Sequence, residues 1–190
     1  MNKEITNNSD FNNIDSLIGK LKTKDAENQK LSRNMTIIYA VMVVFYSGLF
    51  LINPDPELGA DRRIGGACYA LAFSIFFFYF AYYSRKLKRI NYADSVKNMM
   101  VAAEKRLRPW HPNMLIVIIG ALLIGVATAY ITRSYLPEHW SFTNIIVVCT
   151  AIFILVIGFG LLVGHKKWRN EQRPLWIASK ELLQELETEE

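Results

Sequence analysis

The sequence has few of the residues from which metal sites and disulfide frameworks are built. It contains two cysteines, Cys68 and Cys149, and three histidines, with no metal-ligand spacing among them. We therefore expect no metal, no cofactor and no disulfide, with the cysteines serving as small packing residues. No catalytic residue is predicted either, because no nucleophile and base occur in a recognisable arrangement.

Charge is missing from four long stretches. Residues 35–52, 64–83, 114–131 and 144–164 contain no Asp, Glu, Lys, Arg or His. A run of about 18 or more apolar residues, at about 1.5 Å per residue, matches a hydrocarbon core of about 30 Å when it is helical. The four stretches therefore predict four membrane-spanning helices. Because proton relays and ion sites use ionisable groups at membrane depth, these spans give no sign of one.

The fold class that follows is an all-α, polytopic membrane protein. We expect a bundle of four transmembrane helices, arranged as two hairpins, with amphipathic cytoplasmic helices attached. The predicted segments are an N-terminal cytoplasmic tail and juxtamembrane helix (1–34), a first transmembrane hairpin (35–83), a basic cytoplasmic helical loop (84–112), a second hairpin (113–164) and a C-terminal cytoplasmic amphipathic helix (165–190).

Basic residues are distributed unevenly between the spans. Of the 22 Lys and Arg residues, 19 lie in the N-terminal segment, the middle loop and the tail, and 3 lie in the two short connections. Because basic residues are retained on the cytoplasmic side, both termini are expected in the cytoplasm of a bacterial cell, with the chain in the cytoplasmic membrane. The same rule accounts for the net charge of +5, so nucleic acid is not an expected partner.

Two basic clusters directly follow the second and fourth spans. Cations at this position interact with lipid phosphates, each contributing on the order of 1 kcal/mol on anionic lipid, so the bilayer is the expected partner. The predicted inner-leaflet anchor residues are Arg85, Lys86, Lys88, Arg89, Lys166, Lys167 and Arg169.

Small residues recur at four-residue spacing inside three spans, where they let helix backbones approach closely. Packing within the bundle is the first interpretation, and a homodimer contact is the alternative. The predicted helix-packing residues are Gly66, Ala70, Ser74, Ala121, Gly125, Ala129, Gly160 and Gly164.

Three charged segments carry apolar residues at helical spacing. One stripe includes Leu17 and Leu21, a second begins after a helix cap at Asp94 or Ser95, and a third follows Pro174. We predict that the acidic tail, with Glu181, Glu185, Glu187, Glu189 and Glu190, packs on the basic loop. The predicted contact residues are Leu17, Leu21, Met100, Leu107, Leu182 and Leu186.

The two halves of the chain show a weak internal similarity. Asp15-Ser16 and Asn34-Met35 match Asp94-Ser95 and Asn113-Met114 at an offset of 79, and Cys68 matches Cys149 at 81. One interpretation is a duplicated unit of one polar helix and one membrane hairpin, giving parallel repeats. The alternative is chance identity between segments under similar constraints.

These patterns favour a non-enzymatic membrane anchor or regulator that binds a cytoplasmic protein through its polar helices, since charge and amphipathic surface are concentrated there. The alternative is a small transporter or channel subunit without membrane-embedded charge. An intramembrane enzyme is the weakest of the three hypotheses.

Overall fold

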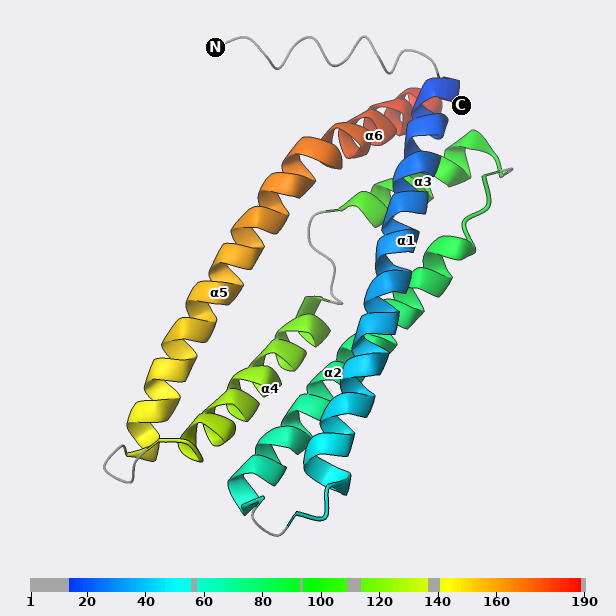
Figure 1. Ribbon diagram of the computed structural model, residues 1–190. Helices are drawn as coiled ribbons and strands as arrows, with labels where there is room; N and C mark the ends of the chain where they lie inside the picture. The colour runs from blue at the N-terminus through cyan, green and yellow to red at the C-terminus, as the bar shows by residue number, and fades with distance from the viewer. Residues whose placement is uncertain (1–13, 56–57, 93, 109–113, 137–140, 189–190) are drawn as a thin grey trace. The chain divides into compact units, whose positions relative to one another are not determined.

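A computed structural model describes residues 14–55, 58–92, 94–108, 114–136 and 141–188. These residues form six α-helices and no strand (Figure 1). The helices are α1 (Ile14–Tyr46), which continues as the π-helical segment η2 (Ser47–Ile52), α2 (Ala60–Lys88), α3 (Val96–Leu107), α4 (Met114–Arg133), α5 (Phe142–Glu171) and α6 (Arg173–Thr188).

Four of these helices are long and apolar enough to cross a membrane: residues 14–52, 60–88, 115–133 and 142–171. The prediction of an all-helical chain with four such helices is confirmed. Three of them extend well beyond the apolar runs, because α1, α2 and α5 continue without interruption into charged sequence. The N-terminal polar stripe and the first apolar run are thus parts of one helix.

The chain divides into two units. The polar unit comprises residues 1–30, 85–111 and 161–190, and the apolar unit comprises residues 31–84 and 112–160. Each unit is assembled from segments that are distant in sequence.

In the apolar unit, aromatic side chains join α1 to α2. The Tyr39 ring lies 5.1 Å from Phe76 and 5.6 Å from Phe80, and Tyr46 lies 4.8 Å from Tyr69. Offset and tilted aromatic pairs at such distances add about 0.5–1.5 kcal/mol each beyond the area they bury. The two helices are therefore joined by a ladder of rings.

Hydrogen bonds and one ion pair join α2 to α4. The hydroxyls of Tyr69 and Thr128 are 2.8 Å apart, and Arg62 Nε donates to Ser134 Oγ at 3.1 Å. Arg133 and Asp61 form an ion pair at 3.4 Å near the ends of the same helices. Hydroxyl contacts of this kind are typical of helix packing where lipid supplies no hydrophobic drive.

The small-residue stripes meet different surroundings in the structure. A Cβ added at Gly66 would lie 2.0 Å from Phe50 Cβ, so a glycine is required for this approach, and one at Gly125 would lie 3.6 Å from Phe153. A Cβ at Gly160 or Gly164 would meet nothing within 4 Å. Of the remaining stripe residues, Ala70 and Ala129 are buried, Ala121 is half-buried, and Ser74 donates to the Ala70 carbonyl at 2.7 Å.

Two close approaches were not predicted from the sequence. A Cβ at Gly65 would lie 2.7 Å from Ile131 Cγ1 and 3.0 Å from the Ala127 carbonyl oxygen, and one at Gly120 would lie 2.7 Å from the Phe76 ring. Contact with a backbone oxygen cannot be relieved by a side-chain rotation. Gly65 is therefore the tightest helix–helix approach to a backbone atom among the described glycines.

The core of the polar unit is made by α1, α3 and α6 together. Leu17 and Leu21 of α1 are 2% and 1% exposed, and they share one cluster with Met100 and Leu107 of α3. The other buried members are Met99, Ala103, Leu175 and Ala178, and Leu182 packs against them while partly buried. Leu186 is half-buried. The apolar faces of these helical segments cover one another.

A local cap begins α3, and a contact with α5 lies at its end. Ser95 is the N-cap, and its hydroxyl accepts a hydrogen bond from the Asn98 amide at 3.3 Å. At the other end, the Trp168 indole donates to the Leu107 carbonyl at 2.8 Å, which satisfies one of the acceptors left free where a helix stops. A side chain of α5 thereby fixes the end of α3.

Candidate functional site

A buried ion pair lies beside the apolar cluster of the polar unit. Arg106 Nη2 donates to Asp25 Oδ2 at 2.9 Å, and the Tyr92 hydroxyl donates to the same oxygen at 2.6 Å. The side chains of Arg106 and Asp25 are 12% and 9% exposed, so both charges are largely removed from water. Breaking such a pair leaves a charge buried without compensation.

Helical spacing explains how the two charges meet. Asp25 follows Leu17 and Leu21 at steps of four, and Arg106 follows Met99 and Ala103 at seven and three. Each charge therefore lies on the apolar stripe of its own helix. We did not predict this pair, although a charge on an otherwise apolar stripe is a sign of a buried partner.

The pKa of Tyr92 is raised above its ordinary value. Burial is the largest cause, because it disfavours the charged phenolate. The Asp25 carboxylate raises the pKa further, because it accepts a hydrogen bond from the phenol and would repel the phenolate. Arg106 acts in the opposite direction, but more weakly. Tyr92 is therefore a hydrogen-bond donor across the neutral range.

A second charged contact joins α1 to the end of α5. Lys24 Nζ donates to Glu171 and to Glu27, the latter at 3.1 Å. Burial alone would lower the pKa of Lys24, but the two carboxylates outweigh it and raise that pKa. The hydrogen bond from Lys24 lowers the pKa of Glu171, which is exposed, so losing this contact should cost much less stability than breaking the buried pair.

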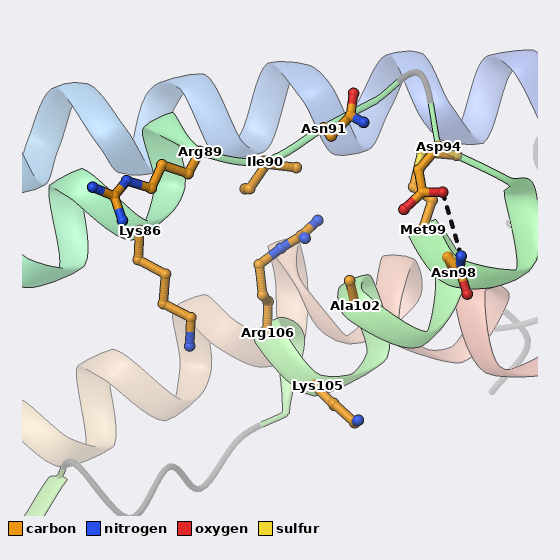
Figure 2. Close-up of a pocket in the computed structure, with 10 residues that line it drawn as sticks. All are labelled: Lys86, Arg89, Ile90, Asn91, Asp94, Asn98, Met99, Ala102, Lys105 and Arg106. Carbon is orange, nitrogen blue, oxygen red and sulfur yellow. Dashed lines mark hydrogen bonds between the residues drawn. The ribbon is translucent and has the colours of Figure 1, made fainter.

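Four cations line a pocket of about 360 Å³ between the end of α2 and α3. We call it the basic pocket (Figure 2). Its lining includes Lys86 from the end of α2, Arg89 directly after it, and Lys105 and Arg106 from α3. Figure 2 shows the Arg106 guanidinium extending toward Ile90 and Asn91 across the opening. The remaining lining residues are Ile90, Asn91, Asp94, Asn98, Met99 and Ala102.

One lining residue of the basic pocket is a carboxylate, and it is already engaged. Asp94 accepts from the Ser95 amide at 2.8 Å and from the Asn98 side chain at 3.3 Å, the bond drawn in Figure 2. These bonds hold the start of α3. Four cations therefore face a cavity whose one acidic lining group is committed to a helix cap.

All seven residues predicted as inner-leaflet anchors are exposed. Lys86 and Arg89 line the basic pocket, and the other five do not. Lys105 and Arg106 were counted in the basic loop, but they were not singled out as site residues. Glu189 and Glu190, which were assigned to the acidic tail, lie outside the described residues, as do His111 and His139.

Metal and thiol chemistry received no support from the part of the chain that the structure describes. No group of three or more His, Cys, Asp or Glu side chains there is placed to hold a metal ion. Cys68 and Cys149 are free and half-buried, and the His165 ring stacks on Trp168 at 5.8 Å.

The fold and this site define the chain as an all-helical protein with four helices able to cross a membrane and a polar helical unit that carries a basic pocket. In comparisons with protein families, curated proteins and solved structures, none matches this chain.

Proposed function

We propose that this chain is a non-enzymatic membrane anchor or regulator, and that its polar unit binds a protein partner. The observation that carries the proposal is the shared core of α1, α3 and α6, in which Leu17, Met100 and Leu175 lie in one buried cluster. Because of this core, the polar unit presents a surface that is already folded before any partner binds. A preformed surface binds without the entropy cost of ordering a flexible segment.

The shared core also changes which surface is available to a partner. The apolar stripes of the three helical segments cover one another, so recognition falls to the outward polar faces. On α6 that face is acidic, with Glu181, Glu185 and Glu187 exposed. A basic partner surface is the complement of this face.

The test is a pull-down of the full chain in a mild neutral detergent. Deleting residues 175–190 would remove Leu175 and Ala178 from the core, so charge reversal is the better perturbation. Glu181→Lys with Glu185→Lys should abolish capture of a defined partner, while Lys22→Glu, at an exposed position on α1, should leave it intact. Equal capture of the partner by the wild type, the Glu181/Glu185 double variant and Lys22→Glu would contradict binding through α6.

We place the four long helices in the bacterial cytoplasmic membrane as a bundle, with both termini and the polar unit in the cytoplasm. The support is the 19 to 3 division of basic residues. Reporter fusions after Gly59 should read external, and fusions after Met100 should read cytoplasmic. An external reading at Met100 would overturn the orientation and the proposed cytoplasmic partner with it.

Duplication remains part of this proposal, resting on the offsets of 79 and 81. The halves differ in one respect. The first polar stripe and the first apolar run form the single helix α1, whereas α3 and α4 are separate helices. A solved structure in which the two hairpins superpose about the membrane normal would support duplication, and unrelated crossing geometry would contradict it.

The alternative, a small transporter or channel subunit, has one specific observation in its favour. An apolar groove of about 370 Å³ lies between α4 and α5 in the apolar unit, lined by Leu122, Gly125, Ile146 and Phe153 among others. Its lining suits an apolar solute or a lipid chain. Release of such a solute from liposomes containing the protein, and loss of release with Gly125→Phe, would favour transport over anchoring.

A further inference from the structure

The basic pocket brings together cations from two segments of the chain. Lys86 lies in the last turn of α2 and Arg89 directly follows that helix, whereas Lys105 and Arg106 come from the last turn of α3. Like charges around one cavity repel one another, and an anion in the cavity relieves that repulsion. The described residues place no carboxylate in an ion pair with Lys86, Arg89 or Lys105.

Two carboxylates already interact with this pocket's own residues: Asp94 is part of its lining, and Asp25 is paired with Arg106. Asp94 is held by the Ser95 amide and Asn98 at the start of α3, and Asp25 accepts from Tyr92 and Arg106. Asp94 in the lining and Asp25 paired with Arg106 offset two of the four positive charges, so the pocket keeps a net positive charge.

Arg106 lines the pocket and is held in place. Asp25 fixes its Nη2, and its Nε is buried with no hydrogen-bond partner among the described residues. A guanidinium that is already oriented loses little freedom when it meets a planar or tetrahedral oxyanion, and arginine forms paired hydrogen bonds to such groups. Asn98, on the same wall, supplies a neutral amide.

We propose that the basic pocket binds a phosphate group, carried by a phospholipid headgroup or by a soluble phosphate compound. A phosphate matches the chemistry of two arginines and two lysines, and a cavity of about 360 Å³ leaves room for the rest of a small headgroup. Lys86 and Arg89 follow the last residue of the second apolar run, Tyr83, by three and six positions. This proposal is independent of the protein partner proposed above.

Titration calorimetry of the full chain in neutral detergent tests the proposal with three probes. The probes are dioctanoyl phosphatidic acid, sn-glycerol 3-phosphate and dioctanoyl phosphatidylcholine, the last with no net charge. Lys86→Gln should weaken phosphatidic acid binding about tenfold, which corresponds to about 1.4 kcal/mol. Lys105→Gln should do the same from the other wall.

Lys88→Gln is the matched control, because Lys88 is exposed, lies two residues from Lys86 and does not line the pocket. It should change the dissociation constant less than twofold. Equal weakening by Lys86→Gln and Lys88→Gln would show general surface electrostatics and overturn the pocket. So would phosphatidylcholine binding as tightly as phosphatidic acid, or an absence of binding by both phosphate monoesters.

The probes also separate the two phosphate sources. Phosphatidic acid binding much more tightly than glycerol phosphate supports a lipid headgroup in the pocket, whereas equal affinity supports a soluble phosphate compound. Because Lys86 and Lys105 are exposed, both variants should keep the hydrogen-exchange protection of α3 unchanged. If Lys86→Gln lost protection, its weaker binding would reflect damage to the fold. If Lys105→Gln then kept both its protection and its normal binding, the proposal would be overturned.

Discussion

Replacing Asp25 by alanine should destabilise the polar unit by about 3–5 kcal/mol, the range found when one partner of a buried ion pair is removed. Arg106 would keep its charge at 12% exposure without the carboxylate, and Tyr92 would lose the acceptor of its 2.6 Å hydrogen bond. Asp25→Asn keeps an acceptor oxygen but removes the charge, so its cost should be smaller, about 1–3 kcal/mol.

Hydrogen exchange of the full chain in neutral detergent measures the loss of stability of the polar unit separately from that of the apolar unit. Each 1.4 kcal/mol is a factor of ten, so amides of residues 17–25 and 96–107 should lose roughly 100-fold or more of their protection in Asp25→Ala. Amides of α4, in the apolar unit, serve as the internal reference.

Lys22→Ala is the matched control, because Lys22 lies on α1 and is exposed. It should change protection by less than threefold, corresponding to about 0.5 kcal/mol. If Asp25→Ala behaved like Lys22→Ala, the carboxylate would not be holding Arg106, and the energetic role assigned to the buried pair would be wrong.

Three further predictions concern packing and pH. Met100→Ala should cost about 2–5 kcal/mol by the same exchange assay, because Met100 is fully buried, and a cost below 1 kcal/mol would contradict the shared core. Gly65→Ala should lower the melting temperature in detergent, since its Cβ would lie 3.0 Å from a backbone oxygen, while Gly160→Ala should not; the reverse order would refute the α2–α4 approach. Because the pKa of Tyr92 is raised, the stability that its hydrogen bond contributes is complete below pH 10 and is lost as the pH rises further. Protection of α3 should therefore fall more above pH 10 in the wild type than in Tyr92→Phe, in which Lys24 still titrates.

Composition alone predicted the four long helices, because a bilayer demands long uncharged helical runs. Helical spacing alone also assigned Leu17, Leu21, Met100 and Leu107 to the inner faces of their segments, where the structure has them. Spacing identifies the apolar face of a helix, but it does not identify which other helix packs against that face. The pairing of Asp25 with Arg106, 81 residues apart, therefore could not be predicted.

The small-residue stripes show the same limit inside the apolar unit. Gly66 and Gly160 look alike in sequence, yet one lies against Phe50 and the other has open space beside it. Gly65 is off the stripe that begins at Gly66, but it is the residue that approaches the α4 backbone. Which side of a helix faces a neighbour depends on helix rotation, and a stripe of small residues does not fix that rotation.

The basic pocket was not predicted, although two of its lining residues were predicted as inner-leaflet anchors. Lys86 and Arg89 stood out because they follow an apolar run, but Lys105 and Arg106 appeared only as the charged end of a short helix. The turn between Lys88 and Val96 brings the two pairs to one cavity. Turn geometry over so few residues is set by tertiary contacts as well as by local preference.

The scattered origin of the shared core has a consequence for the order of events during synthesis. Leu21 emerges from the ribosome roughly 150 residues before Leu175, which at 5–20 residues per second is a delay of about 8–30 s. Over that interval the apolar stripe of the first helix has no α6 to cover it, and all four long apolar helices are synthesised before α6 exists. Closing so long a loop is slow, and an uncovered apolar stripe is prone to aggregation meanwhile. Ribosomes stalled before residue 175 should therefore carry a nascent chain whose Leu17 and Leu21 are accessible to chaperones, an exposure that ends when the last helix is released.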